Sequence, residues 1–249
     1  MLNNEKINFV FFYIKKNGRS ITSENILHTQ SEEDISYFIS SIKKNHPDAN
    51  IVQCTDLKTP KVDGINMILR ENIDQSKIME ARIFLYSKIN FNTTSVFLDT
   101  DMLLVQKIPF ELFIDKANIF LLKRSFNLEG KPPEKFRGQY YDEHANGTLG
   151  KLYPYIGCFV IVNKKNFWRD CYNIYKKYNN NYKFWFGDQK VLSEIISSKN
   201  YKFAFLNESD FACPPAYTIE KKLPYLIHFK GKNYKNLIKK YYHHIYGNK

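Results

Sequence analysis

Two aspartates one residue apart, Asp99 and Asp101, follow an apolar run near the middle of the chain, in the stretch TSVFLDTDMLLVQ. Two carboxylates this close repel each other unless a positive group lies beside them. A hard divalent cation such as Mg²⁺ or Mn²⁺ meets that need, because it prefers oxygen ligands and is often shared with phosphate oxygens. The pair therefore suggests a metal site for a phosphorylated ligand. The structural alternative is a turn cap, or pairing with a surface lysine.

The surrounding segments predict an α/β fold. Strands are predicted for the short apolar runs at 7–14, 49–54, 66–70, 95–98, 155–163, 203–206 and 223–229. Helices are predicted for the runs with helical spacing at 31–44, 76–89, 167–178, 187–197 and 235–246. Alternating strands and helices are typical of a mainly parallel sheet, whose ligands bind beyond the carboxyl ends of the strands. If the strand before the acidic pair continues through it, both carboxylates lie on one face.

One long polar segment, 123–153, interrupts this alternation. It contains Pro132 and Pro133 together with four glycines, and it is too long for an ordinary connection. We expect it to be either a functional loop or lid, or a disordered stretch. The chain shows no internal repeat and no Gly/Ser linker, so a single domain over 1–249 is expected.

Composition narrows the classes of protein. A formal net charge of +12 favours anionic ligands such as phosphorylated molecules, nucleic acid or an acidic membrane leaflet, or is simply a solvated basic surface. The four cysteines are scattered without a CxxC pair, which favours reduced, buried thiols. No apolar run approaches the roughly 20 residues of a membrane span, and the N-terminal run lacks a signal-peptide cleavage site. We therefore expect a cytoplasmic protein.

Five separated stretches, in order, resemble the GT-A-fold glycosyltransferases, and in particular the retaining, nucleotide-sugar-dependent enzymes of family eight (the glycogenin and bacterial lipopolysaccharide type). They are MEARIFLYSKI, VFLDTDMLLVQKI, IGCFVIVNKKNFWRD, GDQKVLSEI and LPYLIHFKGKNYK. Tyr155 and Tyr234 stand where that family usually has Asn and Lys. The resemblance implies one mixed, mainly parallel sheet flanked by helices. It also implies a nucleotide-binding half at 1–106 and an acceptor half at 107–249, which holds the 123–153 loop and a C-terminal helix.

The resemblance also implies roles for individual residues. Asp101 and His228 would ligate Mn²⁺ or Mg²⁺, and Asp99 would ligate the ion or hold the donor ribose. Further contacts to the donor would come from Phe12, Tyr13, Asp56, Arg82, Gly231, Lys232 and Lys235. Asp188 and Gln189 would lie near the anomeric carbon, where Asp188 would be a transient nucleophile or a hydrogen-bond partner of the sugar.

Most of these residues have a structural alternative. His228 could be a hydrogen-bonded core histidine, Arg82 could pair with Glu80, and Asp188 could be a helix N-cap. Phe12 and Tyr13 could simply pack in the core. The lysines could simply be solvated.

The expected activity is metal-dependent transfer of a sugar from a nucleotide sugar, with UDP as the favoured nucleotide. The acceptor would be a glycan, a lipid-linked molecule or a protein, and the route would be retaining. An inverting route would need a carboxylate base such as Asp142 or Glu143. The basic segment 235–246 could associate with the periphery of an anionic membrane at its inner face, or pack as a terminal helix.

Two other functions fit parts of the sequence. Haloacid-dehalogenase-type phosphatases also place two aspartates after a strand, but this chain has Leu103 where they usually want Thr or Val. A nucleic-acid-binding module would explain the charge. However, the aromatic residues lie in strand-like runs rather than in exposed basic–aromatic patterns, so we expect no nucleic-acid partner.

Overall fold

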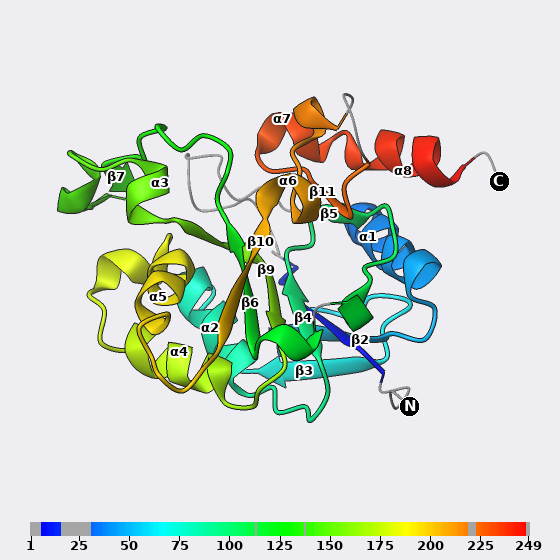
Figure 1. Cartoon of the computed structure of the whole chain (residues 1–249), viewed down its shortest axis with the longest axis horizontal. Helices are drawn as coiled ribbons and strands as arrows, with labels where there is room; N and C mark the ends of the chain where they lie inside the picture. Colours follow the sequence, from blue (N-terminus) through cyan, green and yellow to red (C-terminus); the bar gives the residue numbers. More distant parts are fainter. Residues whose placement is uncertain (1–5, 16–30, 113, 137, 219–222, 248–249) are drawn as a thin grey trace.

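The computed structural model describes residues 6–15, 31–112, 114–136, 138–218 and 223–247 (Figure 1). Its centre is a seven-stranded sheet in the order β10-β6-β9-β4-β1-β2-β3. The strands are β1 (Asn8–Phe12), β2 (Asn50–Asp56), β3 (Met67–Glu71), β4 (Ser95–Leu98), β6 (Ile119–Lys123), β9 (Tyr155–Val162) and β10 (Phe203–Asn207). Neighbouring strands are parallel except where β9 runs antiparallel to β4 and β6. The predicted mixed, mainly parallel sheet is confirmed.

Helices cover both faces of this sheet (Figure 1). They are α1 (Glu32–Asn45) on one face, and α2 (Ile78–Ser87), α4 (Phe167–Tyr175) and α5 (Gly187–Ile195) on the other. Successive residues of a strand point to opposite faces. Phe9 and Phe11 of β1 therefore join the core beneath α1, and Val10 joins the core beneath α2. Burial on both faces explains why these strands are continuous apolar runs in the sequence.

The chain turns sharply after β4. This strand ends at Leu98, residues 99–101 bend, and β5 (Met102–Leu104) then pairs antiparallel with β11 (Leu226–His228) in a separate two-stranded sheet. The strand therefore does not continue through Asp101, so the condition under which both carboxylates would lie on one face of a strand is not met. The register places His228 opposite Met102, and the Phe229 backbone amide donates to the Asp101 carbonyl at 2.8 Å. Residues 126 positions apart in the sequence (102 and 228) thus meet through this pairing.

Helix α1 packs against β5, the strand that follows the bend. Ser31 caps this helix with a capping box: its hydroxyl accepts from the Asp34 amide at 3.1 Å, and the Asp34 carboxylate accepts from the Ser31 amide at 3.1 Å. Farther along the helix, the Ser41 hydroxyl accepts a hydrogen bond from the Leu104 amide at 3.1 Å. This bond fixes β5 against the helix.

The segment 123–153 is folded where the structure describes it, so the disordered alternative is wrong there. It contains the short strands β7 (Lys135–Phe136) and β8 (Gln139–Tyr140), a 3₁₀ turn at Asp142–His144, and α3 (Leu149–Leu152). A small core joins Phe136, Tyr141 and Tyr153 of this segment to Tyr182 and Phe186. Propensity alone does not reveal this order, because it comes from packing against residues 178–186.

The C-terminal part differs from its prediction in one respect. The expected helix over 235–246 is two helices, α7 (Lys232–Lys235) and α8 (Ile238–Tyr246). Helix α8 packs on α1, where the hydroxyls of Tyr242 and Ser40 lie 2.5 Å apart. The interpretation of a packed terminal helix is confirmed. Among the helices that the structure describes, none is long and apolar enough to cross a membrane.

Candidate active site

A cavity of ≈ 350 Å³ lies beyond the carboxyl end of β4, within the size range of small-ligand sites. One side of it is charged and the other is apolar. The charged and polar side is formed by Arg82, Asp99, Asp101, Asp188, Gln189, His228, Lys230 and Lys235. The apolar side is formed by Met79, Pro133, Phe136, Ile156, Trp185 and Phe186. The predicted acidic pair and the predicted catalytic pair therefore line one cavity.

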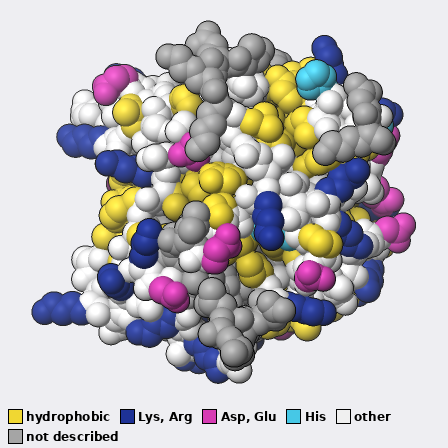
Figure 2. Space-filling view, turned by 45° about the vertical axis from the view of Figure 1, so that its right-hand side comes forward, with side chains coloured by type: hydrophobic (Ala, Val, Ile, Leu, Met, Phe, Trp, Pro, Cys, Tyr) yellow, Lys and Arg dark blue, Asp and Glu magenta, His cyan; other side chains and the backbone are white. Residues whose placement is uncertain are grey.

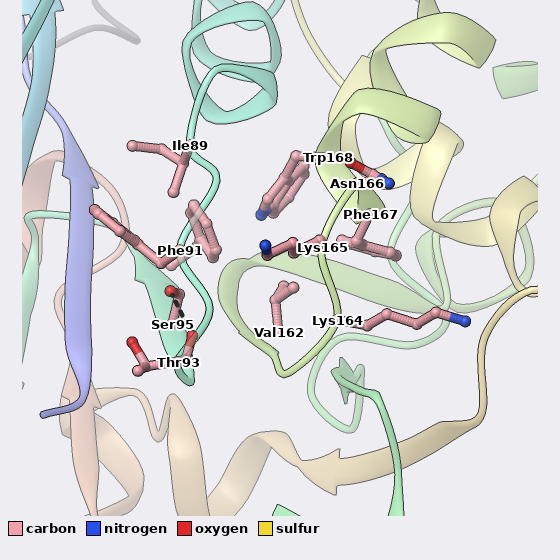
Figure 3. Close-up of a pocket in the computed structure, with 11 residues that line it drawn as sticks. Ile89, Phe91, Thr93, Ser95, Val162, Lys164, Lys165, Asn166, Phe167 and Trp168 are labelled. Carbon is pink, nitrogen blue, oxygen red and sulfur yellow. Dashed lines mark hydrogen bonds between the residues drawn. The ribbon is translucent and has the colours of Figure 1, made fainter. Parts of the chain in front are cut away.

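A second cleft, at the opposite end of β4, is much smaller than this cavity. It is lined by Ser95, Phe97, Val162 and Trp168 among others (Figure 3). Its volume of ≈ 20 Å³ has room for little more than a water molecule. A nucleotide does not fit there.

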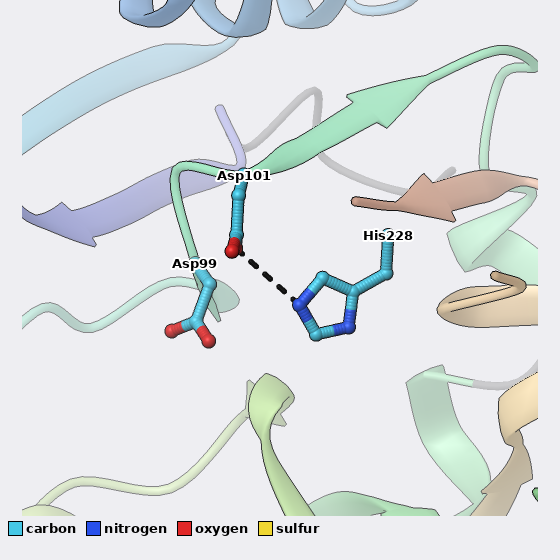
Figure 4. A group of neighbouring side chains, drawn as sticks. All are labelled: Asp99, Asp101 and His228. Atoms are coloured by element: carbon cyan, nitrogen blue, oxygen red, sulfur yellow. Dashed lines mark ion pairs between the residues drawn. The ribbon is translucent and has the colours of Figure 1, made fainter. Parts of the chain in front are cut away.

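Three potential metal ligands meet at the bend after β4. The ligand atoms of Asp99, Asp101 and His228 all lie within 4.8 Å of one another, and the three side chains point toward the same space (Figure 4). His228 Nε2 is 3.3 Å from Asp101 Oδ1, and Lys235 Nζ is 3.2 Å from Asp101 Oδ2. Two carboxylates and an imidazole suit Mn²⁺, whereas Mg²⁺ favours oxygen ligands alone. The residues fit a divalent ion.

The two carboxylates differ in their electrostatics. Burial raises the pKa of Asp101, but the charges and hydrogen bonds of His228 and Lys235 outweigh it and bring this pKa well below the usual value. Burial also raises the pKa of Asp99, and Arg82 offsets that only in part while Asp101 adds to it. Burial lowers the pKa of His228, but Cys158 and Asp101 raise it above its ordinary value. Asp101 is therefore the carboxylate that is held most firmly ionised.

Arg82 connects the acidic pair to the catalytic candidates. One guanidinium nitrogen is 2.7 Å from Asp99 Oδ1, and the other pairs with Asp188 Oδ2. The alternatives of an Arg82–Glu80 pair and of Asp188 as an N-cap are both wrong, since Phe186 is the N-cap of α5. Gly157 on β9 makes this approach feasible, because a Cβ there would collide with the Asp188 carboxylate and crowd Arg82.

Three predicted donor contacts lie outside this cavity. Phe12, Tyr13 and Asp56 lie at the carboxyl ends of β1 and β2, on the same edge of the sheet as Asp99. The Asp56 carboxylate accepts hydrogen bonds from the backbone amides of Thr59 at 2.7 Å and Lys58 at 3.2 Å, so it also fixes the turn after β2. Segment 16–30, which follows β1, is outside the described residues.

The segment after β11 lines part of the cavity. Gly231 lines the cavity with φ of +88°, a backbone conformation that favours glycine. Lys230 and Lys235 line the cavity too. The side chain of Lys232, which begins α7, is outside the described part of the structure.

From the sequence, three residues were assigned no role at this site: Cys158, Arg124 and Glu208. Cys158 lines the cavity beside His228, and its role as a buried thiol was the only one predicted. Arg124 follows β6 and donates to Gln189, and Glu208 accepts hydrogen bonds from the backbone just after Arg124. The apolar run IFLLK before Arg124 was the available signal, since a polar residue after a buried strand is a site candidate in such sheets.

Comparison with known proteins supports the fold. No protein-family model matches the chain, and none of the curated proteins matches it. Two structures of the glycosyltransferase GlyE from Streptococcus pneumoniae TIGR4 align over 96% of this chain, with TM-scores of 0.58 and 0.56 at 12% and 13% identity. The galactosyltransferase LgtC, solved with donor and acceptor sugar analogues, aligns over 96% of this chain and 95% of its own, with a TM-score of 0.53 and 13% identity.

The fold is therefore that of the GT-A glycosyltransferases. The predicted fold class is confirmed, and this architecture does not support the haloacid-dehalogenase alternative. The chain aligns with only 60% of the length of GlyE, so features of the remainder of that protein have no counterpart in the alignment.

Proposed function

We propose that this chain is a metal-dependent glycosyltransferase that takes a sugar from a nucleotide-sugar donor, with UDP as the favoured nucleotide. The observation that carries the proposal is the meeting of Asp99, Asp101 and His228 with the Arg82–Asp188 ion pair in one cavity. A purely structural cluster would satisfy its charges internally and leave no room beside them. Here the charges face a space large enough for a small ligand.

The strand order suggests how the donor lies along the edge of the sheet. The edge runs from β4 through β1 to β2, so Asp99, Tyr13 and Asp56 follow one another along it. We place the nucleoside over the ends of β1 and β2, near Phe12, Tyr13 and Asp56, and the diphosphate at the bend after β4. The 1–106 half would then bind the nucleotide, and the 107–249 half would face the acceptor.

The chemistry follows from charge. When bound, a divalent ion held by Asp99, Asp101 and His228 would neutralise the charge that develops on the departing diphosphate. Lys230 and Lys235 lie on the same side of the cavity and oppose the same charge. Lys232, on the neighbouring turn, is proposed to do likewise. These groups act most strongly where the charge is largest, in the transition state.

We infer that Asp188 acts at the sugar. It is 4% exposed, lies beside the strand at Gly157, and is oriented by Arg82. We propose a retaining route in which Asp188 stabilises the positive charge at the anomeric carbon or binds a sugar hydroxyl. An inverting base at Glu143 is less suited, because its carboxylate already accepts hydrogen bonds from Tyr182 and Lys190.

The acceptor would approach from the apolar side of the cavity. Phe136 and Trp185 stack there with ring centroids 5.5 Å apart, and Phe136 belongs to the 123–153 segment. We propose that this segment borders the acceptor, a glycan, lipid-linked molecule or protein. On the face shown in Figure 2, Lys and Arg side chains are interspersed with Asp and Glu rather than gathered in one stripe. This distribution favours a local anion site over a nucleic-acid surface.

A binding panel tests the proposal. Thermal stability is compared with UDP, GDP, CMP and ADP, each with and without Mn²⁺, for the wild type and for Asp101→Ala. We expect UDP to raise the melting temperature only with Mn²⁺, and only in the wild type. Exposed Asp63→Ala is the matched control and should behave as the wild type. Equal stabilisation with and without metal, or unchanged stabilisation in Asp101→Ala, would refute the metal-bridged donor site.

A further inference from the structure

Gln189 is held by a buried arginine that does not itself reach the cavity. Arg124 is 5% exposed, and one of its terminal nitrogens donates to Gln189 Oε1 at 2.7 Å. Its Nε donates to the Tyr153 carbonyl at 2.9 Å, and its backbone amide donates to the Pro154 carbonyl at 2.8 Å. The guanidinium is therefore anchored at two points, and the backbone of the same residue at a third.

A second buried charge fixes the backbone that carries Arg124. Glu208, on α6 (Glu208–Phe211), is 6% exposed and accepts from the amides of Ser125 at 2.7 Å and Phe126 at 2.9 Å. The chain just past β6 is thus held by a carboxylate from a different element. Burial lowers the pKa of Arg124, but nearby Glu208 opposes this. The arrangement keeps Arg124 aimed at α5.

This contact decides which end of the Gln189 amide faces the cavity. An amide's oxygen and nitrogen are ordinarily hard to tell apart, but arginine has donors only, so the atom bound to Arg124 must be the oxygen. Gln189 lines the cavity, and no described residue is seen to accept a hydrogen bond from its amide nitrogen. The NH₂ group is thus the end left to meet a ligand.

We propose that Gln189 acts in the transfer reaction as a hydrogen-bond donor to the substrate, and that Arg124 is the positioning residue that fixes this orientation. The proposal rests on the proposed function above and assigns a specific atom within it. With its oxygen turned toward Arg124, Gln189 presents its amide nitrogen, rather than its carbonyl oxygen, to the cavity. Asp188, its sequence neighbour, is left as the anionic group at that position.

The contact can be tested without any activity. The stabilities of the wild type, Arg124→Met, Gln189→Met and the double variant form a double-mutant cycle. We expect the double variant to melt above the temperature obtained by adding the two single shifts, because the bond can be lost only once. Strict additivity would overturn the assignment of the contact.

The role is tested with UDP-glucose and UDP-galactose in Mn²⁺, using water as the acceptor. In this reaction the water oxygen bonds to the anomeric carbon, the bond from that carbon to UDP breaks, and a proton is released. Gln189→Glu keeps an oxygen for Arg124 but replaces the donor with an acceptor, so we expect kcat to fall about 100-fold. Arg124→Met frees the amide to rotate, so we expect a fall of about 10-fold. UDP–Mn²⁺ affinity should stay unchanged in both.

Each outcome has a distinct meaning. Wild-type or higher activity in Gln189→Glu would overturn the donor role and favour an oxygen nucleophile. Loss of UDP–Mn²⁺ affinity in Arg124→Met would show a general structural effect and overturn the positioning role. Arg169→Met is the control, because Arg169 is an exposed arginine on α4 that does not line the cavity. If the wild type neither binds UDP nor cleaves either sugar nucleotide, the proposed function fails along with the amide's role, and the cycle still decides the contact.

Discussion

Two buried polar clusters of this molecule differ in what their charges face. The charged cluster consists of Arg82, Asp99, Asp101, Asp188, His228 and Lys235, and it lines the cavity. The tyrosine cluster consists of Tyr141, Glu143, His144, Tyr153 and Tyr182, and it lies within and beneath the 123–153 segment. Both bring together residues far apart in sequence, but only the first opens onto space for a ligand.

The polar groups of the tyrosine cluster form hydrogen bonds within the protein. His144 Nδ1 lies 2.7 Å from the Pro133 carbonyl, so this nitrogen must be the donor. His144 Nε2 then accepts from the Tyr153 hydroxyl at 2.6 Å. Both side chains are fully buried, and Tyr182 and Lys190 satisfy Glu143. Each polar atom named here has its partner inside the protein, as buried polar groups require.

The comparison indicates a division of roles. Substitutions in the charged cluster should change ligand binding and catalysis more than folding, whereas substitutions in the tyrosine cluster should change folding alone. The following four changes test that division, from the largest expected effect to the smallest.

Asp101→Ala should cause the largest loss of function. It removes the most firmly ionised ligand of the metal group, so we expect sugar-nucleotide cleavage to fall at least about 100-fold. The variant should remain folded by circular dichroism, because the removed carboxylate lines the cavity and is not part of the hydrophobic core. Retention of more than half of the wild-type rate would remove Asp101 from the charged cluster's function.

Gly157→Ala should come next. The added methyl group occupies the space of the Asp188 carboxylate and displaces it from Arg82. We expect kcat to fall about 10-fold or more, with a loss of about 1–3 kcal/mol in the free energy of unfolding. UDP–Mn²⁺ affinity, measured by titration calorimetry, should be kept, since the metal ligands are not displaced. Normal kcat in this variant would show that Asp188 does not need its observed position.

Tyr153→Phe should lower stability and leave activity unchanged, the opposite of the effect expected for Asp101→Ala. It leaves His144 Nε2 buried without its donor, so we expect a loss of about 1–3 kcal/mol in the free energy of unfolding by urea denaturation. Cleavage activity and UDP–Mn²⁺ affinity of the folded protein should be unchanged. Tyr140→Phe, at a 61% exposed position, is the control and should be neutral. A tenfold fall in activity for Tyr153→Phe would erase the distinction between the clusters.

Acid should affect the tyrosine cluster slightly. Burial raises the pKa of Glu143, but hydrogen bonds from Tyr182 and the charge of Lys190 outweigh it and lower this pKa below 4.5. The ionised form is therefore favoured by folding, so its stabilisation is present above pH 4.5 and is lost as pH falls through the folded-state pKa.

Because Glu143 is partly exposed, the contribution should be below about 1 kcal/mol. It is measured as the difference between wild type and Glu143→Gln in urea unfolding at pH 7 and at pH 3. The gap between the two proteins should narrow at pH 3, and a gap that widens would contradict the sign.

Sequence patterns located the elements better than the contacts between them. The strand Ser95–Leu98 was predicted with its observed bounds, and the helix predicted over 31–44 is observed over Glu32–Asn45, because both patterns are encoded in adjacent residues. The acidic pair, His228, Asp188 and Gln189 were also predicted to share a site. Their grouping came from a family resemblance rather than from local physics.

What the sequence did not reveal depends on long-range packing. The pairing of β5 with β11, which brings His228 to Asp101, joins two three-residue strands that have little periodicity. Gly157 could be recognised as a glycine in a strand, but its reason lies in Asp188 on α5. Arg124 was overlooked because β6 was not predicted. The order of the 123–153 segment could not be predicted from its polar sequence, because it depends on tyrosines that pack against residues 178–186.

Direct metal binding is the most immediate test of the central claim. The electron paramagnetic resonance signal of free Mn²⁺ is followed as wild type or Asp101→Ala is added, with and without UDP. The account predicts that the free signal falls with the wild type, falls further when UDP is present, and stays unchanged with Asp101→Ala. An equal loss of signal with both proteins, or no loss with the wild type and UDP together, would contradict a metal-bridged diphosphate at the tip of β4.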